Sequence, residues 1–295
     1  MSGRPRVFAA ITAAVAAFAA TAVADEVPKD KGTFRFGIIG DSGSGDPAQF
    51  RVAEHLVEAH RYYPLELVIM LGDNIYGRED PKEYAARFEK PYRSLLDAGV
   101  PFYAALGNHD HPNQRFYREF NMEGRRYYTF KAKDESVRFF ALDSNYLDPE
   151  QVGWLKQQAC GASEHWKIAF FHHPIYSSGA AHGSSLELRT ILEPIFEECG
   201  IDVVFSGHDH FYERIKPQHD ILYFVSGAAG KLRRSNIRKS ELTAAGFDQG
   251  YHFLVAAIAG DALRFTALSD EGKVIDSGEW GGRGEDAKAS KEKQP

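Results

Sequence analysis

The apolar positions of this chain fall into short, unbroken runs that end in clusters of polar residues. The run at 67–70, Leu-Val-Ile-Met, has no polar position facing either side, which predicts a strand buried on both faces. It is followed closely by Gly72 and Asp73. We expect further strands of this kind at 33–39, 100–106, 166–171 and 202–205. Because ligands of open α/β sheets bind at the carboxyl ends of the strands, the polar clusters there are the candidates for function.

Amphipathic segments alternate with these strands and predict helices. Asp46 and Pro47 form a helix-start signal, and apolar or small residues then recur at Phe50, Ala53 and Leu56, which predicts a helix that returns to the strand at 67. Further helices are predicted at 81–97, 149–159 and 185–199. Additional strands are predicted as a hairpin of 126–131 with 137–142, and at 221–226, 251–258, 262–268 and 273–279. The alternation predicts an α/β fold.

The two ends of the chain differ in composition from the rest. Residues 1–24 combine Arg4 and Arg6 with an Ala-rich apolar run and an Ala-Val-Ala site, the pattern of a cleaved signal peptide. We therefore expect a secreted or periplasmic protein that has no membrane contact after cleavage. Residues 281–295 are rich in Lys, Glu and Gly and predict a disordered polar tail. Residues 25–280 contain no linker or fixed-period repeat and predict one domain.

Charge and cysteine content narrow the classes of partner. The formal net charge is −6, and removal of Arg4 and Arg6 would make it more negative, so nucleic acid is not an expected partner. We expect a monomer. In an oxidising compartment Cys160 and Cys199 could form a bridge, but two unpaired buried thiols fit the sequence equally well, because it does not give their separation.

Five segments at predicted strand ends carry side chains that bind metals. They are Asp41, Asp73 with Tyr76, Asn108 with His109, His172, and His208 with His210. Oxygen and imidazole ligands without cysteine argue against a soft-metal or iron–sulfur site. The two carboxylate oxygens of Asp73 can bridge two cations, which would form the pair of metals that clamps an in-line displacement at phosphorus. The phenol of Tyr76 would ligate only a strongly Lewis-acidic metal; alternatively, its ring caps the core.

As a set, these motifs resemble the five-motif signature of the purple acid phosphatases, within the calcineurin-like metallophosphoesterase superfamily. The motifs are G-D-S-G at 40–43, G-D-N-I-Y at 72–76, G-N-H-D at 107–110, A-F-F-H at 169–172 and G-H-D-H at 207–210. S-G-A-A-G at 226–230 resembles a further segment of the family, and the chain length resembles the small, mammalian-type, tartrate-resistant members. The resemblance implies a four-layer α/β/β/α sandwich of two mixed sheets, with the site where strand ends meet.

The resemblance also implies a role for each residue. A ferric ion would be held by Asp41, Asp73, Tyr76 and His210, and a second, divalent metal (Fe, Zn or Mn) by Asp73, Asn108, His172 and His208. His109 would bind a phosphate oxygen and assist the leaving group, and His182 is the second catalytic candidate, at the position of an acid or histidine outside the metal ligands. This chain has Gly43 where most of the superfamily has a histidine, and Ala169 where the fourth motif commonly has valine.

The activity that these roles imply is hydrolysis of phosphate monoesters by a metal-activated hydroxide, as in an acid phosphatase. Two alternatives remain open at this stage. A phosphodiesterase or pyrophosphatase could use the same metals, because substrate scope depends on loops. A phosphate-binding or redox-active iron protein with little turnover would share the ligands, although His109 argues for catalysis.

Overall fold

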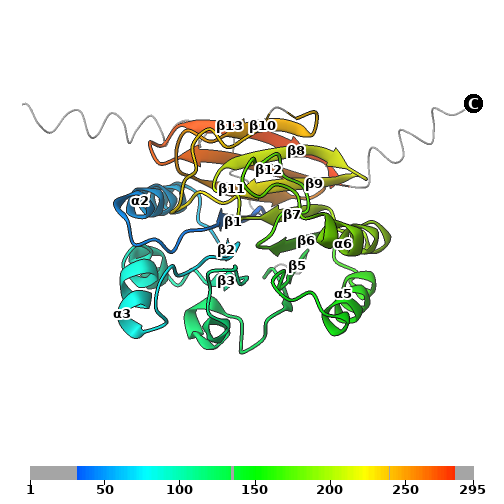
Figure 1. The fold of residues 1–295 in the computed structure, drawn as a ribbon, viewed down its shortest axis with the longest axis horizontal. Helices are drawn as coiled ribbons and strands as arrows, with labels where there is room; N and C mark the ends of the chain where they lie inside the picture. Colours follow the sequence, from blue (N-terminus) through cyan, green and yellow to red (C-terminus); the bar gives the residue numbers. More distant parts are fainter. Residues whose placement is uncertain (1–31, 134–135, 239, 283–295) are drawn as a thin grey trace, which may run out of the picture.

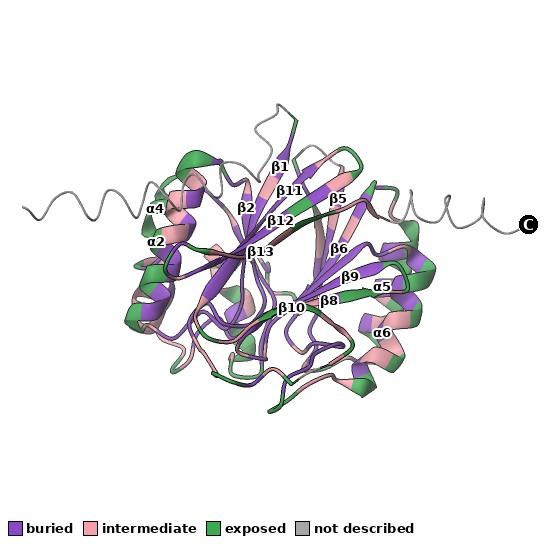
Figure 2. Cartoon of the chain, turned by 90° about the horizontal axis from the view of Figure 1, so that it is seen from above, coloured by how far each residue is buried: buried purple, intermediate pink, exposed green. Residues whose placement is uncertain are grey.

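Two mixed β-sheets pack face to face, with helices on their outer sides (Figure 2). The computed structural model describes residues 32–133, 136–238 and 240–282. The predicted signal peptide at 1–24 and the predicted tail from residue 283 onward lie outside these residues.

The first sheet has the strand order β13-β12-β11-β1-β2-β3. Its strands are β1 (Phe34–Ile39), β2 (Leu67–Met70), β3 (Phe102–Ala104), β11 (His252–Ala259), β12 (Ala262–Ser269) and β13 (Val274–Trp280). β1, β2 and β3 run parallel, and Ile39 pairs with Met70, which pairs with Ala104. The carboxyl ends of these three strands therefore lie level with one another.

The second sheet has the order β10-β8-β9-β7-β6-β5-β4. Its strands are β4 (Tyr128–Lys131), β5 (Val137–Ala141), β6 (Trp166–Phe171), β7 (Val203–Ser206), β8 (Tyr212–Gln218), β9 (Ile221–Ser226) and β10 (Thr243–Phe247). β5, β6, β7 and β9 form the parallel centre, and Phe171 pairs with Ser206. β6 and β7 thus also end level with one another.

Helices flank both sheets (Figures 1 and 2). They are α2 (Pro47–Tyr62), α3 (Pro81–Tyr84), α4 (Arg93–Asp97), α5 (Pro149–Gly161) and α6 (Leu186–Cys199), with the short η1 (Ala85–Glu89), η2 (Pro112–Phe116) and η3 (Arg118–Phe120). α2 and α4 lie beside the first sheet, and α5 and α6 beside the second (Figure 2). The predicted four-layer α/β/β/α sandwich of two mixed sheets is confirmed.

Aromatic side chains fill the space between the sheets. Phe36 of β1 lies with its ring centroid 5.3 Å from that of Phe139 in β5 and 6.1 Å from that of Phe205 in β7. All three are fully buried. Burial of each such side chain stabilises the fold by roughly 1.5–3 kcal/mol, so the packing fixes the two sets of strand ends relative to each other.

The predicted helix at 81–97 is wrong, because the segment divides into α3, η1 and α4. Pro91 lies in its middle and has no N–H to donate to the carbonyl of Arg87. The side-chain amide of Gln49 in α2 donates to that carbonyl instead. Pro91 therefore ends the continuous helical run of α3 and η1, and the buried side chain of Gln49 bonds the Arg87 carbonyl that proline leaves without a donor.

β8 and β10 are not predicted from the sequence. β8 starts two residues after His210 and contains Pro217, and β10 contains Gly246, so neither has the long apolar run of the central strands. The predicted strand at 100–106 is also shorter than expected. β3 ends at Ala104, and the backbone N–H of Ala105 donates to the carbonyl of Met70 as the chain turns toward the strand ends.

Cys160 and Cys199 form a disulfide with their Cα atoms 4.2 Å apart. It joins the ends of α5 and α6, whose following strands β6 and β7 are neighbours in the second sheet. Of the two alternatives that the sequence left open, the bridge is the one that the structure contains. In the part of the chain that the structure describes, every helix is too short or too polar to cross a bilayer.

Candidate metal centre

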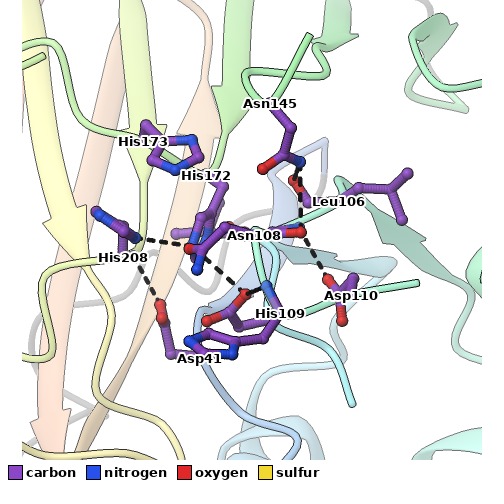
Figure 3. Close-up of polar contacts among 12 residues, drawn as sticks. Asp41, Leu106, Asn108, His109, Asp110, Asn145, His172, His173 and His208 are labelled. Carbon is purple, nitrogen blue, oxygen red and sulfur yellow. Dashed lines mark hydrogen bonds and ion pairs between the residues drawn. The ribbon is translucent and has the colours of Figure 1, made fainter. Parts of the chain in front are cut away.

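The five polar segments meet where the carboxyl ends of the two sheets come together. Segments after β1, β2 and β3 carry Asp41, Asp73 with Tyr76, and Asn108, while segments after β6 and β7 carry His172, His208 and His210. Hydrogen bonds cross between the sheets here. His172 Nδ1 lies 2.9 Å from the carbonyl oxygen of Leu71, and the backbone N–H of His208 donates to Asp41 Oδ2 at 2.8 Å. All seven predicted ligand side chains therefore belong to one cluster, part of which is seen in Figure 3.

One side of the cluster consists of two aspartates, a tyrosine and a histidine. Single ligand atoms of Asp41, Asp73 and His210 lie within 4.8 Å of one another. The hydroxyl of Tyr76 lies 3.2 Å from Asp41 Oδ1 and 3.4 Å from His210 Nε2, which is itself 3.3 Å from Asp41 Oδ1. Three oxygen donors and one nitrogen thus face a common point, a donor set that suits a hard, highly charged cation.

The other side of the cluster is built around Nε2 of His172. Because Nδ1 of this ring faces the Leu71 carbonyl, Nδ1 carries the proton and Nε2 presents a lone pair. Around Nε2 lie Asn108 Oδ1 at 3.0 Å, His208 Nδ1 at 3.1 Å and Asp73 Oδ1 at 3.5 Å. Electron-pair donors that face one another repel unless a cation lies between them, so this arrangement fits a metal site. Asp73 belongs to both sides of the cluster.

The charges in the cluster also fit bound cations. Asp41 and Asp73 are 0% and 1% exposed, and neither has a lysine or arginine partner among the described residues. Burial, followed by the carboxylate of Asp73, raises the pKa of Asp41 well above its usual range. Ionised carboxylates in such surroundings are costly unless a counter-charge lies beside them. Two cations at this position would provide that charge.

Burial keeps the histidines of the cluster neutral. It lowers the pKa of His172 well below the ordinary value and that of His208 to about 2. Burial also lowers the pKa of His210, although the carboxylate of Asp73 acts in the opposite direction. For Tyr76, burial and then the two aspartates raise the pKa, so its phenol would ionise only beside a strongly charged cation.

The backbone takes unusual conformations at three of the predicted ligands. Asp41, Asp73 and His208 have φ values of 53°, 52° and 69°, a region that costs a non-glycine residue energy. A Cβ at Gly43 would lie 2.0 Å from the carbonyl oxygen of Asn74, and the N–H of Tyr76 donates to the carbonyl of Gly43. A histidine at 43 is therefore excluded, and its absence lets the Tyr76 segment approach Asp41.

Asp110 joins two ligand-bearing loops without being a predicted ligand. Its Oδ1 accepts the N–H groups of Asn74 and Ile75 at 2.8 and 3.1 Å. Its Oδ2 accepts the N–H of Gly107 at 2.8 Å and the side-chain amide of Asn74 at 2.9 Å. Asp110 thereby fixes the loop of Asp73 against the loop of Asn108.

Both catalytic candidates lie at the edge of the cluster. His109 is exposed; its backbone N–H donates to Asp73 Oδ1 at 2.9 Å, and its ring centroid lies 5.2 Å from that of Tyr76. The exposed ring of His182 lies 4.2 Å from that of His208, and its Nε2 is 3.3 Å from Nη1 of Arg233. Each ring can thus reach a ligand bound at the cluster.

Two further histidines have different roles. His173 is half-buried, its Nδ1 lies 2.9 Å from Ser144 Oγ, and the ring centroid is 4.4 Å from that of His208. His111 is exposed, and its Nδ1 lies 3.2 Å from the backbone nitrogen of Asn113 in η2 and 2.8 Å from a carboxylate oxygen of Glu79. His111 therefore serves the loop rather than the cluster.

A cavity of about 820 Å³ opens beside Asn108 and His173. Leu106, Leu147, Leu188 and Ile191 give it an apolar wall, and Arg126, Asp143 and Glu187 give it charged groups. Asn145 at its edge donates to the carbonyls of Leu106 and Gly107 at 3.1 and 3.3 Å (Figure 3). The cavity is next to the metal-ligand cluster and is large enough for the organic part of a small ester.

The residues that support the ligand loops are not predicted from the sequence. Asp110 was visible as an acidic residue within a motif, but its acceptor role depends on backbone groups from another loop. Asp209 behaves similarly, because it accepts Ser177 Oγ at 2.5 Å and the N–H of Gly183 at 3.1 Å, which holds the loop of His182. Arg233 lies three residues after the S-G-A-A-G segment at 226–230. The basic residues that follow this segment are the feature of the sequence that could have indicated its role.

Comparison with known proteins agrees with this geometry. The family model described as calcineurin-like phosphoesterase matches residues 34–212, more than half of the chain. Tartrate-resistant acid phosphatase type 5 of Rattus norvegicus is 26% identical, over 82% of this chain and 89% of that protein. The motif-based resemblance is thus confirmed by an independent sequence comparison.

Solved structures share the fold. The GAP50 anchor of the inner membrane complex of Plasmodium has a TM-score of 0.76 at 20% identity, covering 86% of this chain and 90% of its own. A purple acid phosphatase from yellow lupin seeds has a TM-score of 0.65 at 17% identity, covering 85% of this chain and 54% of its own. From the family match, the shared sandwich and the convergent ligand cluster, the chain belongs to the calcineurin-like phosphoesterases.

Proposed function

We propose that this protein is a dimetal acid phosphatase that hydrolyses phosphate monoesters. The observation that carries the proposal is the pair of ligand groups that share Asp73, because two cations at adjacent positions are the arrangement used for displacement at phosphorus. The similarity to a protein named tartrate-resistant acid phosphatase supports the same activity.

The ligand assignment follows the two sides of the cluster. We assign Asp41, Asp73, Tyr76 and His210 to a ferric ion, and Asp73, Asn108, His172 and His208 to a divalent Fe, Zn or Mn. When bound, such cations would supply the Lewis acidity that phosphate ester hydrolysis needs. The protein's own contribution is to hold the ligands on rigid strand ends and to keep the imidazoles unprotonated.

His109 and His182 would act on the substrate. Both rings lie at the edge of the cluster, one beside Tyr76 and one beside His208. A histidine in such a place can donate a hydrogen bond to a phosphate oxygen and a proton to the departing alkoxide. The exposure of His109 leaves room for an ester oxygen beside it.

A fold of this kind does not by itself imply turnover. The GAP50 structure is described as an anchor, and its likeness to this chain concerns the fold alone. The complete ligand cluster and the two edge histidines support an enzyme over a protein that only binds phosphate or iron.

Export is also part of the proposal. The leader pattern of residues 1–24 and the disulfide between Cys160 and Cys199 both fit a secreted or periplasmic protein, since bridges persist in oxidising compartments. Edman sequencing or mass spectrometry of the exported protein should place its first residue at Asp25.

Turnover of 4-nitrophenyl phosphate, bis(4-nitrophenyl) phosphate and pyrophosphate by the metal-loaded protein tests the activity. We expect the monoester to give the highest kcat/KM. His172→Asn should lower it by more than about 100-fold, because a ligand is lost. His111→Asn, an exposed histidine outside the cluster, is the matched control and should retain the wild-type rate. A faster diester reaction would make the protein a phosphodiesterase, and metal-loaded protein without turnover would leave it a binding protein.

A further inference from the structure

We propose that Lys231 and Arg233 form a second anion-binding position beside the metal centre. It would give the protein a preference for phosphate substrates whose organic part carries another negative charge, such as a phosphorylated carboxylic acid. The inference rests on the proposed function, because the first phosphate must bind at the cluster.

The segment that carries these two residues is fixed to the strand ends of the site. The N–H of Ala229 donates to the carbonyl of Gly40 at 3.0 Å, and a Cβ at Gly230 would lie 2.3 Å from the carbonyl oxygen of Ser42. The N–H of Arg233 donates to the carbonyl of His210 at 3.0 Å. The loop is thus tied on one side of Lys231 to the residues that flank Asp41, and on the other side to His210, which is itself a predicted ligand.

Arg233 presents its guanidinium to the edge of the site. Its Nη1 lies 3.3 Å from Nε2 of His182, whose ring lies 4.2 Å from that of His208. Within the described ranges no carboxylate pairs with Arg233, whereas Arg126 is held by Asp143 and Asp148 at 3.1 and 2.7 Å. One donor, Nη1, faces His182, and the other donors of the guanidinium remain open to a carboxylate or phosphate, which a guanidinium can bind in a bidentate way.

Lys231 places a second positive charge on the same edge. Its Nζ lies 5.0 Å from the centre of the Tyr76 ring. The carboxylate of Asp46 is 4.0 Å from Nζ, which is the longest distance that still counts as an ion pair. Its side chain is 37% exposed. Together, the two cations create a positive potential beside the phosphate position and attract an anion to this edge.

The opposite side of the site does not offer such a position. The cavity next to Asn108 is lined by Asp143 and Glu187, and the guanidinium of Arg126 there is already paired. Carboxylates repel a second negative group, so a doubly anionic substrate has one favourable orientation, with its extra charge toward Lys231 and Arg233.

Two non-hydrolysable probes test the inference by calorimetry on the metal-loaded protein. Methylphosphonate carries the phosphonate alone, and phosphonoacetate adds a carboxylate. We expect phosphonoacetate to bind the wild type more tightly. Arg233→Gln should weaken phosphonoacetate binding about 10-fold, the usual effect of losing a charge-assisted hydrogen bond, and change methylphosphonate binding less than about 3-fold.

Two further variants sharpen the experiment. Arg233→Lys keeps the charge without the bidentate geometry and should bind phosphonoacetate with an intermediate affinity. Arg234→Gln is the matched control: Arg234 is exposed on the same segment and donates to the carbonyl of Gln249, away from His182, so both probes should bind as in the wild type. Metal content, measured in each sample, should be equal.

Each outcome distinguishes the two levels of the proposal. Equal affinity of both probes for the wild type, or an equal loss for both in Arg233→Gln, would overturn the second anion position and leave the phosphatase assignment intact. If neither probe binds the metal-loaded wild type, the phosphate site itself is wrong, and the inference fails with it.

Discussion

His252 should make the fold sensitive to acid. It is fully buried at the start of β11, its Nε2 lies 3.0 Å from Ser226 Oγ, and its backbone N–H donates to the carbonyl of Ala228 at 3.0 Å. Burial lowers the pKa of His252 to about 3. In the unfolded chain the ordinary pKa of about 6.5 applies. Because the unfolded state takes up the proton first, stability is complete above pH 6.5 and decreases as the pH falls from 6.5 toward 3.

The size of this effect follows from the two pKa values. At pH 7.5 the unfolded histidine is almost unprotonated, and the difference between the states is negligible. At pH 5.0 protonation of His252 stabilises the unfolded chain by about 2 kcal/mol, whereas the folded chain, in which the histidine stays neutral, gains no such stabilisation. His252→Gln removes the titration, while its side-chain amide can still bond the hydroxyl of Ser226.

Urea unfolding in excess chelator, at pH 7.5 and 5.0, measures the difference. Between pH 7.5 and pH 5.0 the free energy of unfolding should decrease in both proteins. The decrease should be about 2 kcal/mol smaller in His252→Gln than in the wild type. Other buried groups titrate equally in both proteins and cancel. Parallel decreases in the two proteins would refute the assignment of this acid sensitivity to His252.

Three further predictions concern the site and the disulfide. Asp73→Asn should lose both metals together, measured by atomic absorption, because both sides of the cluster use this carboxylate; retention of two tightly bound metals would contradict the shared role. His109→Ala should lower kcat by roughly 10² to 10⁴ with unchanged metal content, and loss of one metal equivalent would show that it is a ligand. Replacing Cys160 and Cys199 by serine should lower the free energy of unfolding by about 4 kcal/mol, since the bridge closes a loop of 39 residues; an unchanged urea midpoint would argue against the bridge in solution.

The strand ends and the metal-binding residues were predictable because both depend on local sequence. An apolar run such as 67–70 requires burial on both faces, and Gly72 with Asp73 marks where the strand stops. Parallel pairing then brings the ends of neighbouring strands together without further information. The structure places all seven predicted ligand side chains in one cluster for this reason.

Other features depend on partners distant in the sequence. The break in the segment at 81–97 follows from Pro91, but its tolerance depends on Gln49 in another helix. β10 forms because β8 offers it an edge, not because Thr243–Phe247 has a strong strand pattern of its own. Asp110 and Arg233 acquire their roles from groups that tertiary folding brings beside them.

Metal analysis together with a visible spectrum tests the central claim most directly. The wild-type protein should contain two metals per chain, at least one of them iron, and should absorb visible light through a Tyr76 phenolate on Fe(III), since this phenol faces both Asp41 and His210. Tyr76→Phe should lose the band and hold its iron less tightly. A colourless wild type with stoichiometric ferric iron, or an unchanged band in Tyr76→Phe, would contradict the assignment of Tyr76 to the metal centre.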